Sequence, residues 1–124
     1  MVPKELVKAR WIKCMNSPIW IRKNISNQKL KPGLPYQDPV KFGKWLEKNI
    51  GNPKKVTPIL FGLTLDCCVL STLQELNWRD YYPKVLYEAV DHYLATQKLK
   101  DEVIESSITN WADIIYWKDL KSKI

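Results

Sequence analysis

The chain has 124 residues, which is enough for one domain but not for two, so we expect a single domain over residues 1–124. Its share of hydrophobic residues, 45%, is ordinary for a soluble globular protein. Its apolar runs are too short for a transmembrane helix, and its first ten residues lack the apolar segment of a secretory signal. We therefore expect a cytoplasmic protein that does not bind a membrane.

The net charge and the cysteine content bear on the binding partners and on the redox state of the thiols. The formal net charge of +7 is high for so short a chain, and it could serve an anionic partner. However, the lysines are scattered along the chain, which favours a solvated surface over a nucleic-acid interface. The three cysteines include the adjacent pair Cys67 and Cys68, a pattern that suits reduced thiols better than a disulfide framework.

The N-terminal part is predicted to contain a helix, a strand and a loop. Apolar residues at helical spacing predict a helix over Glu5 to Met15. The apolar burst Ile19–Ile21 predicts a short strand. Residues 26–38 are rich in Asn, Lys, Gly and Pro without a period, which predicts a loop.

A second helix is predicted to begin at Asp38 and Pro39. Asp38 can accept hydrogen bonds from free backbone N–H groups, and proline is well suited to the first helical position. Gly51 is predicted to end this helix, whose apolar residues keep helical spacing: Phe42, Trp45, Leu46 and Ile50. The continuous apolar run from Val56 to Phe61 then predicts a strand that is buried on both faces, as in parallel sheets.

The C-terminal half alternates helices and strands. A helix follows Gly62, and its apolar face is formed by Val69, Thr72, Leu73 and Leu76. Further segments are predicted in the order strand, helix, strand: Lys84 to Tyr87, Lys98 to Ile108, and Asp113 to Trp117. This order indicates an α/β fold in which the strands are parallel neighbours and helices pack on the sheet.

The turn between the strand at Val56 to Phe61 and the next helix carries the most informative residues. In open α/β sheets the active crevice lies beyond the carboxyl ends of the strands. A cysteine in the first turn of a helix is close to backbone N–H donors and to the positive end of the helix dipole, and both favour the thiolate. The same N–H groups could stabilise an oxyanion. Alternatively, Cys67 and Cys68 are small buried apolar residues, as cysteines commonly are. This alternative stays open because the sequence places no catalytic partner beside them.

Five residues in this turn resemble a known nucleophile motif. Gly62, Asp66, Cys68, Val69 and Thr72 are similar to the pattern of the isochorismatase-like cysteine hydrolases, in which a glycine is followed by Thr-Asp-x-Cys-Val and a threonine. Three other segments also resemble strands of the family. Ile19 to Asn24 resembles the strand that delivers the catalytic lysine, and Lys84 to Ala89 resembles the strand that ends in Asp-Ala. Ala112 to Ile115 resembles the final strand. The resemblance implies a three-layer α/β sandwich with a mostly parallel, Rossmann-like sheet.

The resemblance also implies roles for individual residues. Cys68 would be the nucleophile that forms a thioester with a small amide or related substrate. Lys23 would steady the thiolate and the developing negative charge. The backbone N–H groups of Thr64 and Cys68 would form the oxyanion hole, Gly62 and Asp66 would support the motif, and no cofactor is implied.

The chain departs from the family pattern in several places. Leu65 stands where the family usually has threonine, while the cis peptide that the family places nearby would be the Leu63–Thr64 bond. The family's first strand, which ends in the aspartate that acts as general base, has no counterpart, so the fold is expected to be trimmed at the N-terminus. Pro58 agrees with a trimmed sheet, because proline suits an edge strand.

The single histidine and the acidic residues bear on what replaces the missing groups. The metal-binding cluster of the nicotinamidases is absent, and we expect His92 to be a surface loop residue with no metal role. An acidic residue near Cys68 could take the place of the missing general base, and four candidates can be named: Glu5, Asp38, Glu88 and Asp91.

Three functions are consistent with these observations. The first is a cysteine hydrolase, and the second is a catalytically inactive remnant or binding subunit of the same fold. The third is nucleic-acid binding through exposed aromatic residues, but Trp45 and Trp78 are expected to pack in the core. A sheet without its usual central strand should expose apolar surface, so we also predict a homo-oligomer.

Overall fold

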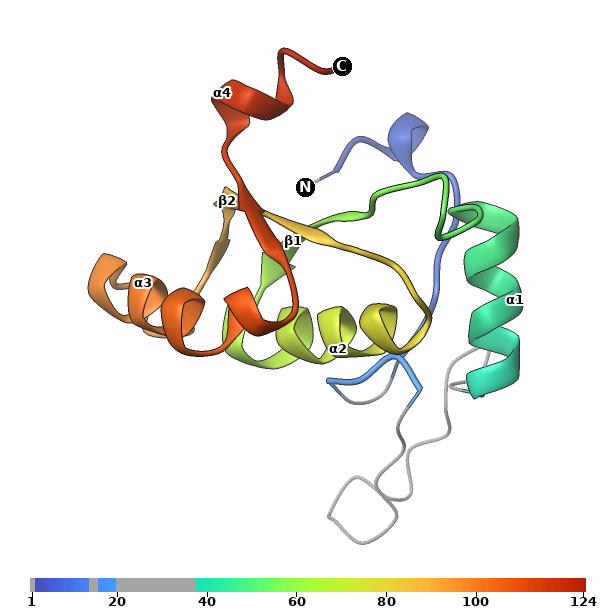
Figure 1. Cartoon of the computed structure of the whole chain (residues 1–124), viewed down its shortest axis with the longest axis horizontal. Coiled ribbons are helices and arrows are strands. Elements are labelled where there is room, and N and C mark those ends of the chain that lie inside the picture. The colour runs from blue at the N-terminus through green and yellow to red at the C-terminus, as the bar shows by residue number, and fades with distance from the viewer. Residues whose placement is uncertain (1, 14–15, 20–37) are drawn as a thin grey trace, which may run out of the picture. The chain divides into compact units, whose positions relative to one another are not determined.

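The computed structural model describes residues 2–13, 16–19 and 38–124, which belong to two compact units (Figure 1). The first unit extends to Asn52 and the second runs from Pro53 to Ile124. Each unit has its own elements and packing.

The helix of the first unit, α1 (Pro39–Asn49), begins and ends as the sequence predicts. The Asp38 carboxylate accepts a hydrogen bond of 2.9 Å from the backbone N–H of Lys41, and proline occupies the first turn. Gly51 has a φ of +116°, in the left-handed region, and its N–H donates to the Leu46 carbonyl. The residues at its two ends therefore determine where α1 begins and ends.

The helix expected over Glu5 to Met15 is wrong for the part that the structure describes. Within residues 2–13 only a short 3₁₀ turn, η1 (Lys4–Leu6), is helical. Trp45 Nε1 of α1 donates to the Arg10 carbonyl at 3.1 Å, and the Trp11 ring lies 5.0 Å from the Phe42 ring. These contacts with α1 replace an internal helical ladder, because tertiary packing overrides weak propensity.

The second unit contains the sheet and the remaining helices. In chain order its elements are β1 (Ile59–Leu63), the π-helical turn η2 (Leu65–Val69), α2 (Leu70–Trp78), β2 (Lys84–Asp91), α3 (Gln97–Ser106), the 3₁₀ turn η3 (Ile108–Asn110), β3 (Asp113–Ile115) and α4 (Trp117–Leu120). The three strands form one sheet in the order β1-β2-β3, and both pairings are parallel. This confirms the predicted α/β class and the parallel arrangement of the three strands.

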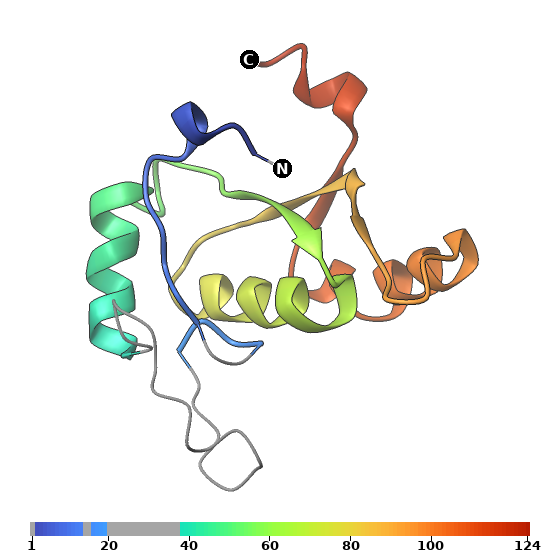
Figure 2. The ribbon, with the colours of Figure 1, turned by 180° about the vertical axis from the view of Figure 1, so that it is seen from behind.

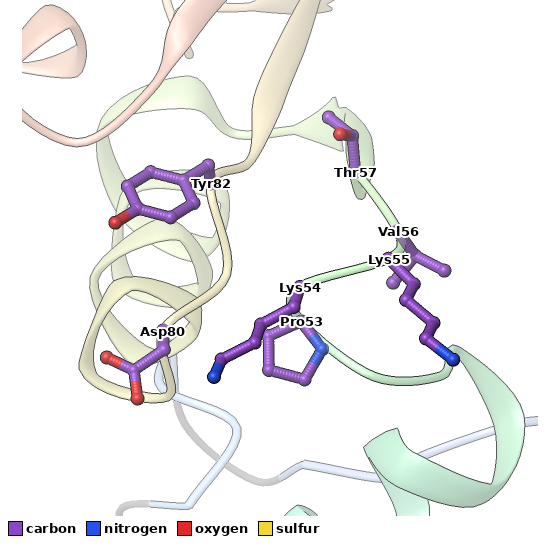
Figure 3. A pocket seen from close by; sticks show the side chains of 7 residues that line it. All are labelled: Pro53, Lys54, Lys55, Val56, Thr57, Asp80 and Tyr82. Carbon is purple, nitrogen blue, oxygen red and sulfur yellow. The ribbon is translucent and has the colours of Figure 1, made fainter.

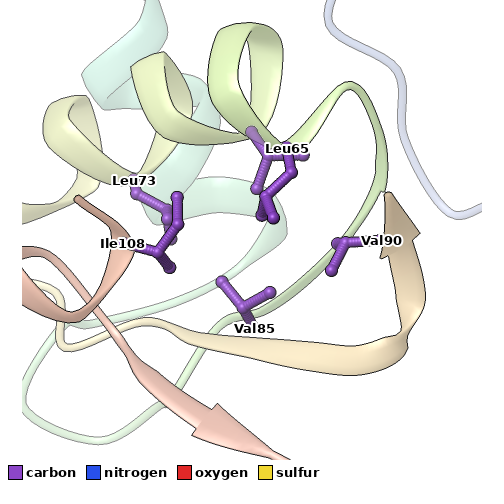
Figure 4. Close-up of a cluster of buried hydrophobic side chains, with 6 residues drawn as sticks. Leu65, Leu73, Val85, Val90 and Ile108 are labelled. Atoms are coloured by element: carbon purple, nitrogen blue, oxygen red, sulfur yellow. The ribbon is translucent and has the colours of Figure 1, made fainter. Parts of the chain in front are cut away.

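The hydrophobic core lies between the sheet and the helices that cover one of its faces. Figures 1 and 2 show α2 and α3 on the same side of the sheet. The side chains at the centre come from η2, α2, η3 and the strands (Figure 4): Leu65, Val69, Leu73, Val85, Val90 and Ile108. Burial of one such side chain contributes about 1.5–3 kcal/mol relative to exposure. The core therefore fixes η2 and α2 against the sheet.

β1 begins three residues later than predicted and is not buried on both faces. Pro58 comes directly before it, and the Pro58 carbonyl accepts a hydrogen bond from Lys84 N at 2.8 Å. Leu60 packs against the core, whereas Phe61 and Leu63 are 56% and 69% exposed. The uninterrupted apolar run suggested burial on both sides, but β1 is an edge strand of the sheet that the structure describes. An edge position is what the proline indicated.

The last two strands also differ in length from their predicted ranges. β2 extends to Asp91 instead of ending at Tyr87. β3 ends at Ile115, because the next residues turn into α4, where the Glu88 carboxylate accepts a hydrogen bond of 2.9 Å from the Trp117 N–H.

In the part of the chain that the structure covers, no helix is both long and apolar enough to cross a bilayer.

Candidate active site

Cys68 lies in the helical turn that directly follows β1, at the carboxyl end of the parallel sheet. β1 ends at Leu63, Thr64 precedes η2, and Cys68 is the fourth residue of that turn. Cys67 and Cys68 are both half-buried thiols. This is the part of an open α/β sheet where substrates usually bind.

Hydrogen bonds hold the backbone around Cys68 in place. The Thr64 carbonyl accepts from the N–H groups of both Cys67 and Val69 at 3.2 Å. One turn later, Thr72 Oγ1 donates to the Cys68 carbonyl at 2.7 Å. The threonine of the motif thus has a structural use, since it fixes the carbonyl of the cysteine residue.

The backbone before the turn has two unusual features. The Leu63–Thr64 peptide bond is cis, at the place where the resemblance implied it. Gly62 has a φ of +129°, which residues with a side chain rarely adopt, although an added Cβ would meet no atom within 4 Å. Backbone conformation rather than space therefore requires glycine at this position.

His92 lies in the loop directly after β2, as expected, but it is not on the surface. It is only 8% exposed, and its Nε2 lies 3.3 Å from Asp66 Oδ2. Asp66 follows the end of β1 and His92 follows the end of β2, and these parallel neighbours pair Leu63 with Asp91. Because β2 is longer than predicted, its carboxyl end brings His92 to the Cys68 turn.

Only the general position of this pair could be expected from the sequence. Polar residues that follow neighbouring parallel strands meet at one edge of the sheet. The strand predicted to end at Tyr87 would leave His92 five residues beyond the sheet, whereas β2 continues to Asp91. The sequence of β2 does not mark this end, because its buried residues, Val85 and Val90, do not alternate.

The acidic residues suggested as a replacement base are mostly engaged elsewhere. Asp38 caps α1 in the first unit, and Glu88, in the middle of β2 rather than at its end, caps α4. Asp91 Oδ1 accepts from the His92 backbone N–H at 3.1 Å. Glu5 lies in η1 of the first unit. Lys23 lies outside the described residues, so its expected role stays a prediction.

A surface hollow of about 570 Å³ lies at the opposite end of the sheet from Cys68 (Figure 3). It is lined by residues 53–57, which lead into β1, and by Asp80 and Tyr82, which lead into β2. Parallel strands have their amino ends together, so this hollow and the Cys68 turn are at opposite edges. Lys54, Lys55 and the Asp80 carboxylate give the hollow mixed charge.

The two tryptophans expected in the core differ from each other. Trp45 is half-buried and packs against the rings of Trp11 and Phe42. Trp78, in contrast, is 79% exposed at the end of α2, so its expected core packing is wrong. The helical spacing of α2 places Leu73 and Leu76, but not Trp78, on the buried face.

A polar cluster joins β2 to α3. Tyr87 Oη donates to Asp101 Oδ1 at 2.6 Å and accepts a hydrogen bond from Gln97 Nε2. The hydrogen bond to Asp101 raises the pKa of Tyr87 above its usual value, and the desolvation of the phenol adds to this. The Lys100 ammonium lies 4.1 Å from the centre of the Tyr87 ring. These contacts tie α3 to the sheet.

Within the described ranges, no group of three or more His, Cys, Asp and Glu side chains is arranged to hold a metal ion. Comparison of the chain with protein-family models, with curated proteins and with solved structures gives no match. The function is therefore inferred from the residues and their geometry.

Proposed function

We propose that this chain is an isochorismatase-like cysteine hydrolase that acts on a small amide or related substrate. The observation that carries the proposal is the position of Cys68, a half-buried thiol in the helical turn directly after a strand of a parallel sheet. That position offers the helix dipole and backbone N–H donors to a thiolate and to an oxyanion.

The proposed reaction has two steps. The Cys68 sulfur loses its proton and attacks the carbonyl carbon of the amide, the C–N bond breaks, and the amine leaves with that proton. Water then attacks the thioester, which releases the acid and restores the thiol. Thr64 and Cys68 would stabilise the oxyanion through their backbone N–H groups, and Lys23 would steady the thiolate.

The proposal extends to the setting of the site. The sheet would belong to a three-layer sandwich of the family type, with a further layer on the face where Phe61 and Leu63 are exposed. A reduced, cytoplasmic environment would keep the Cys67 and Cys68 thiols available.

A catalytically inactive binding subunit of the same fold is the second candidate. It is favoured by the acidic residues, because Asp38, Glu88 and Asp91 each accept a backbone hydrogen bond. A carboxylate used in this way is less available as the general base that the hydrolase needs. The two candidates therefore differ in turnover and not in ligand binding.

Turnover of small amides by the full chain separates the two candidates. A panel of primary amides is incubated with the protein and ammonia release is measured, with Cys68→Ala as the test variant. Cys67→Ala is the matched control, because it removes the neighbouring half-buried thiol. We expect Cys68→Ala to abolish ammonia release and Cys67→Ala to retain it. Binding of amides without ammonia release would instead support the binding subunit.

A further inference from the structure

Two side-chain contacts hold the helical turn that carries Cys68. Thr72 Oγ1 donates to the Cys68 carbonyl at 2.7 Å, and His92 Nε2 lies 3.3 Å from Asp66 Oδ2. The first bond is internal to the helix, but the second connects the turn to the carboxyl end of β2. Asp66 and His92 thus form the side-chain link between the two strand ends at the site.

The contacts of His92 define which of its nitrogens carries the proton. The backbone N–H of Leu94 donates to His92 Nδ1 at 3.2 Å, so Nδ1 is an acceptor. In the neutral ring the proton is then on Nε2, the nitrogen that faces the Asp66 carboxylate at 3.3 Å. The His92 carbonyl also accepts from Ala95 N at 2.8 Å, which closes a turn behind the ring. The histidine is therefore oriented from both sides.

Asp66 depends on this histidine. Its second oxygen, Oδ1, is buried and has no hydrogen-bond partner among the described groups. A buried carboxylate oxygen without a donor is costly, and the contact of Oδ2 with His92 offsets part of this cost.

The charge of Asp66 also bears on Cys68. A carboxylate near a thiol disfavours the thiolate. Residues two positions apart on a helix do not face each other, so Asp66 acts on Cys68 through its charge and through the backbone and does not contact the sulfur.

We propose that Asp66 and His92 are positioning residues for Cys68. His92 holds the carboxylate of Asp66, whose charge would disfavour the thiolate, at the end of β2, and it thereby anchors the turn there. This inference rests on the proposed role of Cys68 as the reactive thiol. It assigns a use to the histidine that the sequence placed on the surface.

The rate at which iodoacetamide alkylates Cys68 tests the proposal without requiring turnover. The full chain is used with Cys14→Ala and Cys67→Ala, so that Cys68 is the one remaining cysteine of three. Asp66→Asn removes the charge but keeps an oxygen that accepts from His92, whereas His92→Gln keeps a donor toward Asp66 and His92→Leu does not.

We expect Asp66→Asn to raise the alkylation rate at pH 7 about threefold, because a nearby negative charge is lost. His92→Leu should lower the rate by a similar factor, and His92→Gln should restore most of it. The matched control is Glu75→Gln, because it removes an ion-paired carboxylate of α2 that is bonded to Arg79 at 2.9 Å and follows Cys68 by seven residues. This control should leave the rate unchanged.

The opposite signs of the Asp66→Asn and His92→Leu effects separate positioning from simple support of the fold. Loss of a merely structural contact would loosen the turn and expose the half-buried Cys68 thiol, which would speed alkylation in His92→Leu. A faster His92→Leu variant would therefore overturn the proposal, as would an Asp66→Asn rate no higher than that of Glu75→Gln. If circular dichroism shows that His92→Leu does not fold, Asp66→Asn and His92→Gln still decide the outcome. Failure of the proposed hydrolase is a separate result, namely no amide turnover by a chain in which these variants still change the Cys68 rate.

Discussion

Leu65 provides a direct test of the core beneath the Cys68 turn, at a position where the proposed family differs from this chain. The family usually has threonine at this position, but here the leucine side chain is fully buried in the core beside Val69 and Leu73. Replacing Leu65 with threonine removes about two buried carbon groups, worth about 0.8 kcal/mol each. It also buries a hydroxyl, which costs about 1–3 kcal/mol unless it finds a partner. We expect Leu65→Thr to lower the free energy of unfolding by about 3 kcal/mol.

Urea denaturation followed by circular dichroism measures this change, with the slope of the transition compared between variants. Leu65→Val is the matched control, because it is smaller than leucine but carries no hydroxyl, and it should cost only about 1 kcal/mol. The difference between the two variants isolates the buried hydroxyl. A Leu65→Thr variant as stable as the starting chain would refute the reasoning, because position 65 would then not lie in a sealed core.

Three further predictions follow from the backbone, the polar cluster and the exposed strand. Gly62→Ala should lower the free energy of unfolding by about 1–3 kcal/mol, because a φ of +129° is strained for alanine; equal midpoints in urea would contradict this. The pKa of Tyr87 is raised in the folded chain, so its contribution to stability is complete below the usual tyrosine pKa and is lost as the pH rises through the raised value. Asp101→Asn should bring that pKa down, as measured by the tyrosinate absorbance difference from a Tyr87→Phe variant, and an unchanged titration would speak against the Asp101 contact. Finally, the chain should self-associate through exposed apolar surface such as Phe61, and sedimentation velocity showing a monomer at high dilution would count against it.

The parts of the fold that were predictable are those with local signals. Asp38, Pro39 and Gly51 define α1, because capping and left-handed backbone depend on individual residues. Val69, Leu73 and Leu76 define the buried face of α2 for a similar reason, since helical spacing is visible in the sequence. The parallel sheet then follows from the alternation of strands and helices.

The parts that failed depend on contacts between distant residues. The helical spacing of residues 5–15 is real, but Trp45 binds the Arg10 carbonyl, and the segment packs against α1 in another conformation. The apolar run into β1 does not reveal which face the helices cover, so the exposure of Phe61 could not be read from it.

The candidate site was predictable only in part. Cys68 and the Leu63–Thr64 cis bond were named from the motif, and both lie at the carboxyl end of β1. The contact between Asp66 and His92 joins residues 26 positions apart, and it depends on β2 continuing to Asp91. Strand length is set by pairing with β1, which the sequence of β2 alone does not contain.

The most direct test of the account is the chemical identity of the residue that carries an acyl group during turnover. The full chain is mixed briefly with a small activated amide or ester, quenched in acid, and analysed by intact mass and peptide mapping, alongside the Cys67→Ala and Cys68→Ala variants. We expect a hydroxylamine-sensitive acyl adduct in the starting chain and in Cys67→Ala, and none in Cys68→Ala. An adduct that persists in Cys68→Ala, or that is lost in Cys67→Ala, would contradict the assignment of Cys68 as the nucleophile.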